Sequence, residues 1–139
     1  MKQIGLEIDQ NNQFLYAFCC TIKDYKLVWH LNKNTNFNYR KEKDIPFYSE
    51  ELSKKIYFNQ YKDEKNNNNT TIIYNKNKDG FLVSELKDFD FLFLFNWTPV
   101  RNKERLISEL KKIKEYVFLQ KITQKQILKF KNKYILACF

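Results

Sequence analysis

The clearest pattern in the chain is an alternation of aromatic and aliphatic residues near its centre. In the run 88–96, Phe89, Phe91, Phe93 and Phe95 recur at every second position, with leucines between the last three. Successive side chains of a β-strand point to opposite faces of a sheet, so both faces of this strand are apolar. The pattern predicts a strand at the centre of a sheet, with its phenylalanine face in the core or at a homodimer interface.

Shorter patterns predict the other elements. Strands are expected where apolar runs are bounded by turn residues, at 14–20, 39–45, 55–61, 70–74, 81–83, 116–122 and 134–139. Helices are expected where apolar residues recur every three or four positions, at 24–34, 98–114 and 123–131. Thr98 and Thr123 are expected to cap the second and third helices. The four asparagines at 66–69 predict a hairpin tip or loop.

This order of elements predicts one α+β domain over residues 1–139. Two strand-helix units flank an antiparallel middle, which favours a mainly antiparallel sheet with helices on one face and, more specifically, a ferredoxin-like topology. A chain of 139 residues, 43% of them hydrophobic, can bury such a core. Because no apolar run reaches the ~20 residues of a membrane span and the start lacks a signal-peptide pattern, we expect a cytoplasmic protein without a membrane partner.

Positive charge is concentrated in the C-terminal third of the chain. Residues 1–100 hold 14 basic and 13 acidic side chains, whereas residues 101–139 hold 11 basic and 3 acidic ones. The chain has 22 lysines, 16 asparagines and only 3 arginines, a composition typical of a genome rich in A/T codons. Such a bias raises lysine throughout a gene and does not concentrate charge at one end, so residues 101–139 are the first place to seek a binding surface.

Within this third, lysines recur at every fourth position, which predicts a basic stripe on a helix. The stripe consists of Lys121, Lys125, Lys129 and Lys133, and the basic residues that can extend it are Lys111, Lys112, Lys131 and Arg101. A surface of this kind suits the phosphate backbone of RNA, either free or in an RNA-protein assembly. It is equally suited to an adaptor that binds an acidic protein, such as an acyl carrier. The alternative without a function is a solvated helix face in a lysine-rich proteome.

The carboxylates beside the central strand are the main candidates for catalysis. Glu85, Asp88 and Asp90 form a close group, and paired carboxylates can divide the roles of acid and base when their environments differ. Acids at the entrance to a buried strand are, however, more often exposed or bonded to backbone and lysine. An enzyme using Glu85 and Asp90 is therefore the alternative to a binding protein, which is the interpretation that we prefer.

Other catalytic or cofactor sites find little support in the sequence. Cys20, His30 and Asp24 supply the residue types of a nucleophile-base-orienter triad, but their spacing indicates no geometry. His30 is the sole histidine, the chain has no Cys-x-x-Cys pair, and its 2 glycines form no phosphate-binding loop, so we expect neither a metal nor a cofactor. The 3 cysteines are expected to be reduced, buried thiols.

One segment carries a family resemblance. The stretch 82–91, Leu-Val-Ser-Glu-Leu-Lys-Asp-Phe-Asp-Phe, resembles the signature of the IPExxxDY family of small bacterial proteins. Glu85 and Asp90 match the motif, whereas Ser84 replaces its proline and Phe91 its tyrosine. Two further stretches resemble the family's first helix and closing segment, at 23–32 and 128–136. Genes of that family often lie near one for a double-strand-specific ribonuclease, so the resemblance implies a role related to RNA without assigning an activity.

Overall fold

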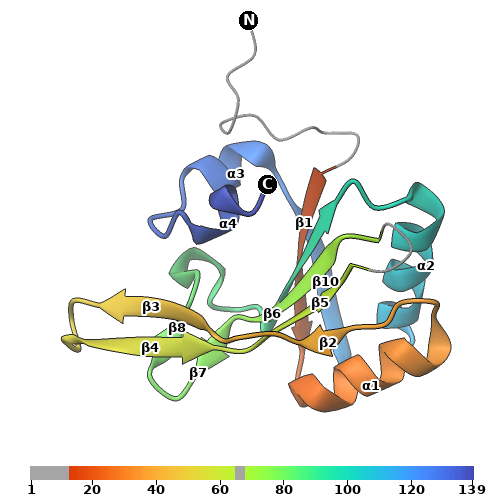
Figure 1. The fold of residues 1–139 in the computed structure, drawn as a ribbon, viewed down its shortest axis with the longest axis horizontal. Helices are drawn as coiled ribbons and strands as arrows, with labels where there is room; N and C mark the ends of the chain where they lie inside the picture. The colour runs from red at the N-terminus through yellow and green to blue at the C-terminus, as the bar shows by residue number, and fades with distance from the viewer. Residues whose placement is uncertain (1–12, 65–67) are drawn as a thin grey trace, which may run out of the picture.

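The fold is built on a six-stranded antiparallel sheet (Figure 1), seen in a computed structural model that describes residues 13–64 and 68–139. The strand order is β10-β1-β9-β6-β5-β2. The strands are β1 (Gln13–Cys20), β2 (Arg40–Lys41), β5 (Gln60–Asp63), β6 (Thr70–Tyr74), β9 (Phe91–Asn96) and β10 (Tyr116–Ile122). The predicted α+β class with a mainly antiparallel sheet is confirmed, and so is the central position of the phenylalanine-rich strand.

Four strands and two helices follow the predicted ferredoxin-like order. Helix α1 (Asp24–Asn34) follows β1, and helix α2 (Val100–Lys111) connects β9 to β10. In the sheet, β9 lies between β1 and β6, while β1 lies between β9 and β10. Helix α2 therefore leads from β9 to a strand two places away in the sheet, as in a split β-α-β fold, whereas α1 is followed in the chain by the edge strand β2, four places from β1.

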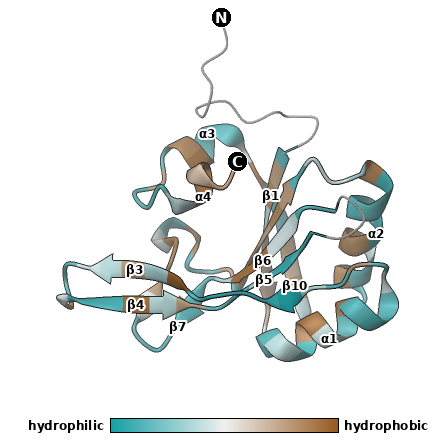
Figure 2. Cartoon of the chain, viewed as in Figure 1, coloured by the Kyte–Doolittle hydropathy of each residue, from teal (hydrophilic) through white to brown (hydrophobic). Residues whose placement is uncertain are grey.

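The phenylalanine face of β9 forms the core beneath α1 and α2. Phe91, Phe93 and Phe95 are buried, and they share one apolar cluster with residues of both helices. Those helix residues recur with helical spacing: Leu27, Val28, Leu31, Leu106 and Leu110. Hydrophilic positions predominate at the two ends of α1 (Figure 2), outside this contact. Phe91, Phe93 and Phe95 are therefore part of the hydrophobic core of a single chain.

The opposite face of the sheet is covered by short elements. Leu92 and Leu94 of β9 lie in a second apolar cluster. The elements over it are β3 (Ile45–Ser49), β4 (Lys54–Phe58), the 3-10 turn η2 (Ser84–Leu86), α3 (Gln124–Leu128) and α4 (Tyr134–Ala137). Helices therefore lie on both faces, whereas the sequence predicted them on one. The aliphatic face of a central strand must also be buried, and the C-terminal helices cover it.

Several boundaries differ from the sequence prediction. The predicted strand at 134–139 is wrong, because this segment contains α4 and places Ile135 in the core. A short apolar run does not distinguish a strand from a helical turn. Phe89 precedes β9 and packs on the aliphatic side, with its ring centroid 5.9 Å from that of Phe118. The predicted strand at 39–45 is divided between β2 and the start of β3, and β3 pairs with β4 in a two-stranded hairpin that includes Pro46.

The helix caps agree with prediction in one case of two. The hydroxyl oxygen of Thr123 accepts a hydrogen bond from the amide of Gln126 at 3.2 Å, as expected for a cap of α3. Thr98 instead donates its hydroxyl to the carbonyl of Asn68, and α2 has no side-chain cap.

A tight turn closes the smallest hairpin. Asp79-Gly80 forms the turn between β7 (Lys76–Asn77) and β8 (Gly80–Phe81), where Gly80 has a φ of 150°. The predicted asparagine tip at 66–69 lies partly outside the described residues. None of the described helices is long and apolar enough to cross a membrane.

Candidate nucleic-acid interface

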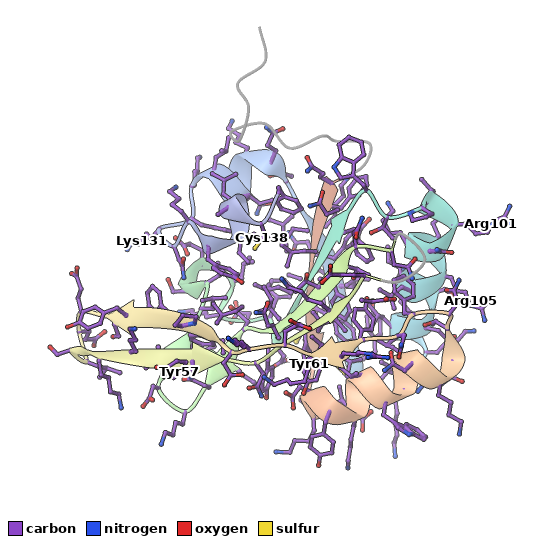
Figure 3. The ribbon with its side chains drawn as sticks, in the orientation of Figure 1. Tyr57, Tyr61, Arg101, Arg105, Lys131 and Cys138 are labelled. Atoms are coloured by element: carbon purple, nitrogen blue, oxygen red, sulfur yellow. The ribbon has the colours of Figure 1, made fainter. Side chains whose placement is uncertain are left out.

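A cleft of about 430 Å³ lies where the end of α1 meets the first turns of α2. Its lining comes from two stretches that are far apart in the sequence: Lys33, Asn34, Thr35, Asn36, Arg101, Asn102 and Arg105. Figure 3 shows Arg101 and Arg105 on the same outer side of α2, with Arg105 beside the end of α1.

Packing of the two helices brings these stretches together. Leu31 of α1 and Leu106 of α2 are fully buried in the same cluster, which fixes the distance between the helices. At the C-terminal end of α1, Nη2 of Arg105 donates to the carbonyl of Asn34 at 3.3 Å. The backbone amide and the hydroxyl of Thr35 both donate to the carbonyl of Leu31, at 3.0 and 2.6 Å, and end α1 at this point.

A buried polar network supports the other side of the cleft. Nδ2 of Asn102 donates to Oδ1 of Asn68 at 2.8 Å, and Nδ2 of Asn68 donates to Oδ2 of Asp63 at 2.9 Å. The same carboxylate oxygen accepts the amide of Asn38, also at 2.9 Å. Asn68 and Asp63 are almost completely buried, so the Asp63 carboxylate is engaged inside the fold and does not line the cleft.

The cleft is electropositive. Lys33, Arg101 and Arg105 line it together with neutral polar residues and no acid. Within residues 13–64 and 68–139, none of these three cations forms an ion pair. The N-terminus of α2 adds partial positive charge, because its first turn contains no acid and receives no side-chain cap. The arrangement attracts anions.

Arginine makes this cleft more informative than the lysine-rich surface around it. Lysine supplies 22 of the 25 basic residues of this chain, and arginine only 3. Two of the three, Arg101 and Arg105, line this cleft. A planar guanidinium can donate two parallel hydrogen bonds to a phosphate, which an ammonium group cannot do.

The four lysines predicted to share one helix lie on different elements. Lys121 is in β10, Lys125 in α3, Lys129 just after α3, and Lys133 just before α4. The predicted helical stripe is therefore wrong. Helix α3 has only 5 residues, and a non-helical link separates it from α4.

The sheet further divides the basic C-terminal third. Arg101 begins α2 on one face, whereas α3 and α4 cover the opposite face. Lys131 and Arg101 accordingly lie on opposite sides of the molecule (Figure 3). Lys111 and Lys112 are at the far end of α2, about 15 Å from Arg101 at the ordinary helical rise, and Lys112 pairs with Glu109 at 3.3 Å. Of the residues that the sequence singled out, only Arg101 lines the cleft.

Lys121 belongs to a separate aromatic cluster. Its Nζ lies 4.7 Å from the ring centroid of Phe14, and Nζ of Lys103 lies 3.8 Å from the same ring. Burial, and then the charge of Lys121, lowers the pKa of Lys103. A smaller hollow of about 190 Å³ adjoins Phe14 and Lys121. Lys121 thus packs on β1, and no lysine stripe includes it.

The carboxylates of the family-like motif have structural partners. Asp90 is buried, accepts the amide of Cys20 at 2.8 Å and forms an ion pair with Lys76. Glu85 is exposed and accepts the amide of Lys131 at 2.9 Å. These contacts confirm the expectation that the acids are exposed or bonded to backbone and lysine.

The hypothetical triad is not assembled. The Asp24 carboxylate accepts hydrogen bonds from Asn59 and Tyr61, while Nε2 of His30 lies 3.7 Å from Glu109. In the described part of the chain, no three histidine, cysteine or acidic side chains are grouped as metal ligands. The cysteines are free thiols, and Cys20 is buried as expected, whereas Cys19 and Cys138 are only half-buried. Burial raises the pKa of Cys20.

Comparison with known proteins finds no match for the chain. No family model matches it, and neither does any curated protein or solved structure. The resemblance to the IPExxxDY family therefore stays a prediction.

Sequence reasoning missed most of the cleft. Lys33 and Arg105 were not among the candidate residues, although Arg101 was. One signal was available, because Arg101 and Arg105 are four residues apart at the start of a predicted helix in a chain that hardly uses arginine. The contribution of α1 has no such signal, since it depends on how two distant helices pack.

Proposed function

We propose that this protein binds RNA through the cleft between α1 and α2. The observation that carries the proposal is the convergence of Lys33, Arg101 and Arg105 around a cleft without acidic lining. Arginine and lysine side chains make most protein contacts to phosphate oxygens. The helix N-terminus beside Arg101 adds amide groups of the same polarity.

Two features support a polymer over a small anion. All three cations are exposed at the protein surface, which suits a ligand that passes across the cleft and extends beyond it. The exposed amide of Asn36 can donate to sugar and phosphate oxygens. A net charge of +9 adds long-range attraction for a polyanion, free or within an RNA-protein assembly.

The proposal is for a binding protein in the cytoplasm and not for an enzyme. It agrees with the RNA-related role implied by the family resemblance. The structural partners of Glu85 and Asp90 make a catalytic role for this pair unnecessary. An acidic protein would be attracted by the same positive charges, so an adaptor function is the competing outcome of the test.

Equilibrium binding of a short fluorescent RNA at low salt tests the proposal. The double variant Arg101→Gln/Arg105→Gln should bind at least about 100-fold more weakly, because each of the two lost charge-assisted hydrogen bonds contributes roughly 1.5 kcal/mol or more. The matched control is Lys125→Gln/Lys129→Gln, which removes two exposed charges on the other side of the sheet and should weaken binding much less.

Three results would overturn the proposal. Equal losses in both variants would indicate diffuse charge, and a larger loss in the lysine variant would place the site on α3. Absence of RNA binding, with tight binding to an acidic protein such as an acyl carrier, would favour the adaptor.

A further inference from the structure

We propose that the RNA held by this cleft is single-stranded, and that its bases stack on exposed aromatic rings along α1. This inference rests on the proposed function and specifies its ligand. The feature behind it is the aromatic stripe, which we define as Tyr25, Trp29 and Lys33.

The aromatic stripe leads directly into the cleft. Successive residues of the stripe are four positions apart on α1, so all three lie on one side of the helix. Nζ of Lys33 lies 4.8 Å from the ring centroid of Trp29, and the same lysine lines the cleft. Lys33 therefore joins the rings to Arg101 and Arg105.

The core does not require these rings. Tyr25 and Trp29 are 60% and 63% exposed, while the buried side of α1 consists of Leu27, Val28 and Leu31. Aromatic side chains that stay mostly exposed contribute little to the stability of the fold, and in a binding surface they provide flat faces for contact.

The charges around the stripe favour nucleic acid over a protein. The only acid of α1 is Asp24, whose carboxylate accepts from Nδ2 of Asn59 at 2.9 Å and from the hydroxyl of Tyr61 at 3.0 Å. The exposed charges at the helix surface are then lysines, at positions 23, 26 and 33. Alternation of aromatic rings and cations is typical of single-strand binding sites, whereas protein-docking surfaces need a wider apolar patch.

The spacing of the stripe suits neighbouring bases. Rings four residues apart on a helix are separated by about 6 Å along its axis. Two bases of a single strand can stack on Tyr25 and Trp29 while the adjoining phosphates reach Lys33 and Arg105. Bases of a duplex already stack on one another, so they cannot use these rings.

The test compares Trp29→Ala with Tyr57→Ala. Tyr57 is a matched control because it is an aromatic residue 53% exposed on β4, away from the arginines (Figure 3). Stacking contributes roughly 1 to 3 kcal/mol per base, so Trp29→Ala should weaken single-stranded RNA binding about 5- to 150-fold. Binding of the same RNA as a duplex should not change. Trp29→Phe should keep most of the affinity, because it keeps a ring.

Fluorescence provides a readout that a merely structural role would not affect. In a Trp97→Phe background, Trp29 is the remaining tryptophan of the chain. Its emission should be quenched when single-stranded RNA is added and should remain unchanged with duplex RNA.

The failure of this inference can be distinguished from failure of the proposed function. If Trp29→Ala binds single-stranded RNA normally while Arg101→Gln/Arg105→Gln does not, the proposed base stacking is wrong. The proposal that the cleft binds RNA phosphates is then retained. Equal loss of single-stranded and duplex binding in Trp29→Ala would also overturn the stacking. If the unmodified protein binds no RNA, both proposals fall.

Discussion

At the scale of single residues, Asp90 belongs to the family-like motif, and its contacts explain it by a structural role. It is buried where β9 begins, and its carboxylate fixes the end of β1 through the amide of Cys20. Its second partner, Lys76, comes from the neighbouring β7–β8 hairpin. One side chain therefore ties three elements together, which is sufficient reason for a carboxylate at this position.

Replacement of Asp90 by Ala should lower the free energy of unfolding by about 2 to 3 kcal/mol, because the Cys20 amide loses a charged acceptor in a buried place. Asp90→Asn, which keeps one acceptor oxygen, should lose less. Urea unfolding measures both, and Asp88→Ala, at an exposed position, is the control that should change stability by less than about 0.5 kcal/mol. Unchanged stability in Asp90→Ala would remove the structural role.

Tyr134 should make stability depend on alkaline pH. Burial, followed by the neighbouring Cys138, raises the pKa of Tyr134 from 10.0 to about 12. Because the folded pKa lies above the unfolded one, this contribution is complete below pH 10 and is lost as the pH rises to about 12. Tyr134→Phe should therefore lose less stability than the unmodified protein between these pH values. Parallel curves from denaturant unfolding would contradict the shift.

At the scale of elements, the core depends on β9 being buried on both faces. Phe93 is fully buried beneath α1 and α2, in the strand between β1 and β6. Its ring centroid lies 5.9 Å from that of Phe18 on the neighbouring strand. A cavity at this point would be enclosed by apolar side chains and would stay dry.

Phe93→Ala should lower the free energy of unfolding by about 3 to 5 kcal/mol, as is usual for a buried aromatic ring. Phe118, which is 49% exposed on the edge strand β10, provides the comparison, and its replacement by Ala should have a clearly smaller effect. A loss below about 1 kcal/mol for Phe93→Ala in urea unfolding would show that β9 is not the centre of the core.

Elements with a strong local pattern were predictable from the sequence. The bounds 24–34, 70–74 and 116–122 match α1, β6 and β10, because the apolar spacing of each segment fits one secondary structure. Segments 123–131 and 134–139 were less predictable. Segment 123–131 has only three apolar residues, whereas 134–139 is apolar throughout and too short to distinguish a strand from a helical turn. The conformation of both depends on the sheet face that they cover.

The candidate site was predictable only in part. Arg101 could be found from the sequence, but the partners of this residue could not. Lys33 and Arg101 are 68 positions apart, and they line one cleft only because α1 and α2 pack on the same apolar cluster, which includes Leu31 and Leu106. The predicted lysine stripe was wrong for a different reason. Lysines four residues apart share one face only on a continuous helix, and residues 121–133 do not form one.

At the scale of the whole molecule, the sheet separates two basic regions. The excess charge of residues 101–139 is real, but α2 and the pair α3–α4 display it on opposite faces. A single RNA strand passing through the cleft would contact only the first region. The second region can add long-range attraction without direct contact, and this attraction weakens with salt.

The salt dependence of RNA affinity tests this account most directly. Each phosphate contact releases counterions and contributes about 0.7 to the slope of log affinity against log salt concentration for a single strand. If the cleft holds the phosphates, Arg101→Gln/Arg105→Gln should reduce the slope by about 1 to 2. Lys125→Gln/Lys129→Gln should leave it nearly unchanged. A normal slope in the arginine variant, together with a reduced slope in the lysine variant, would contradict the account.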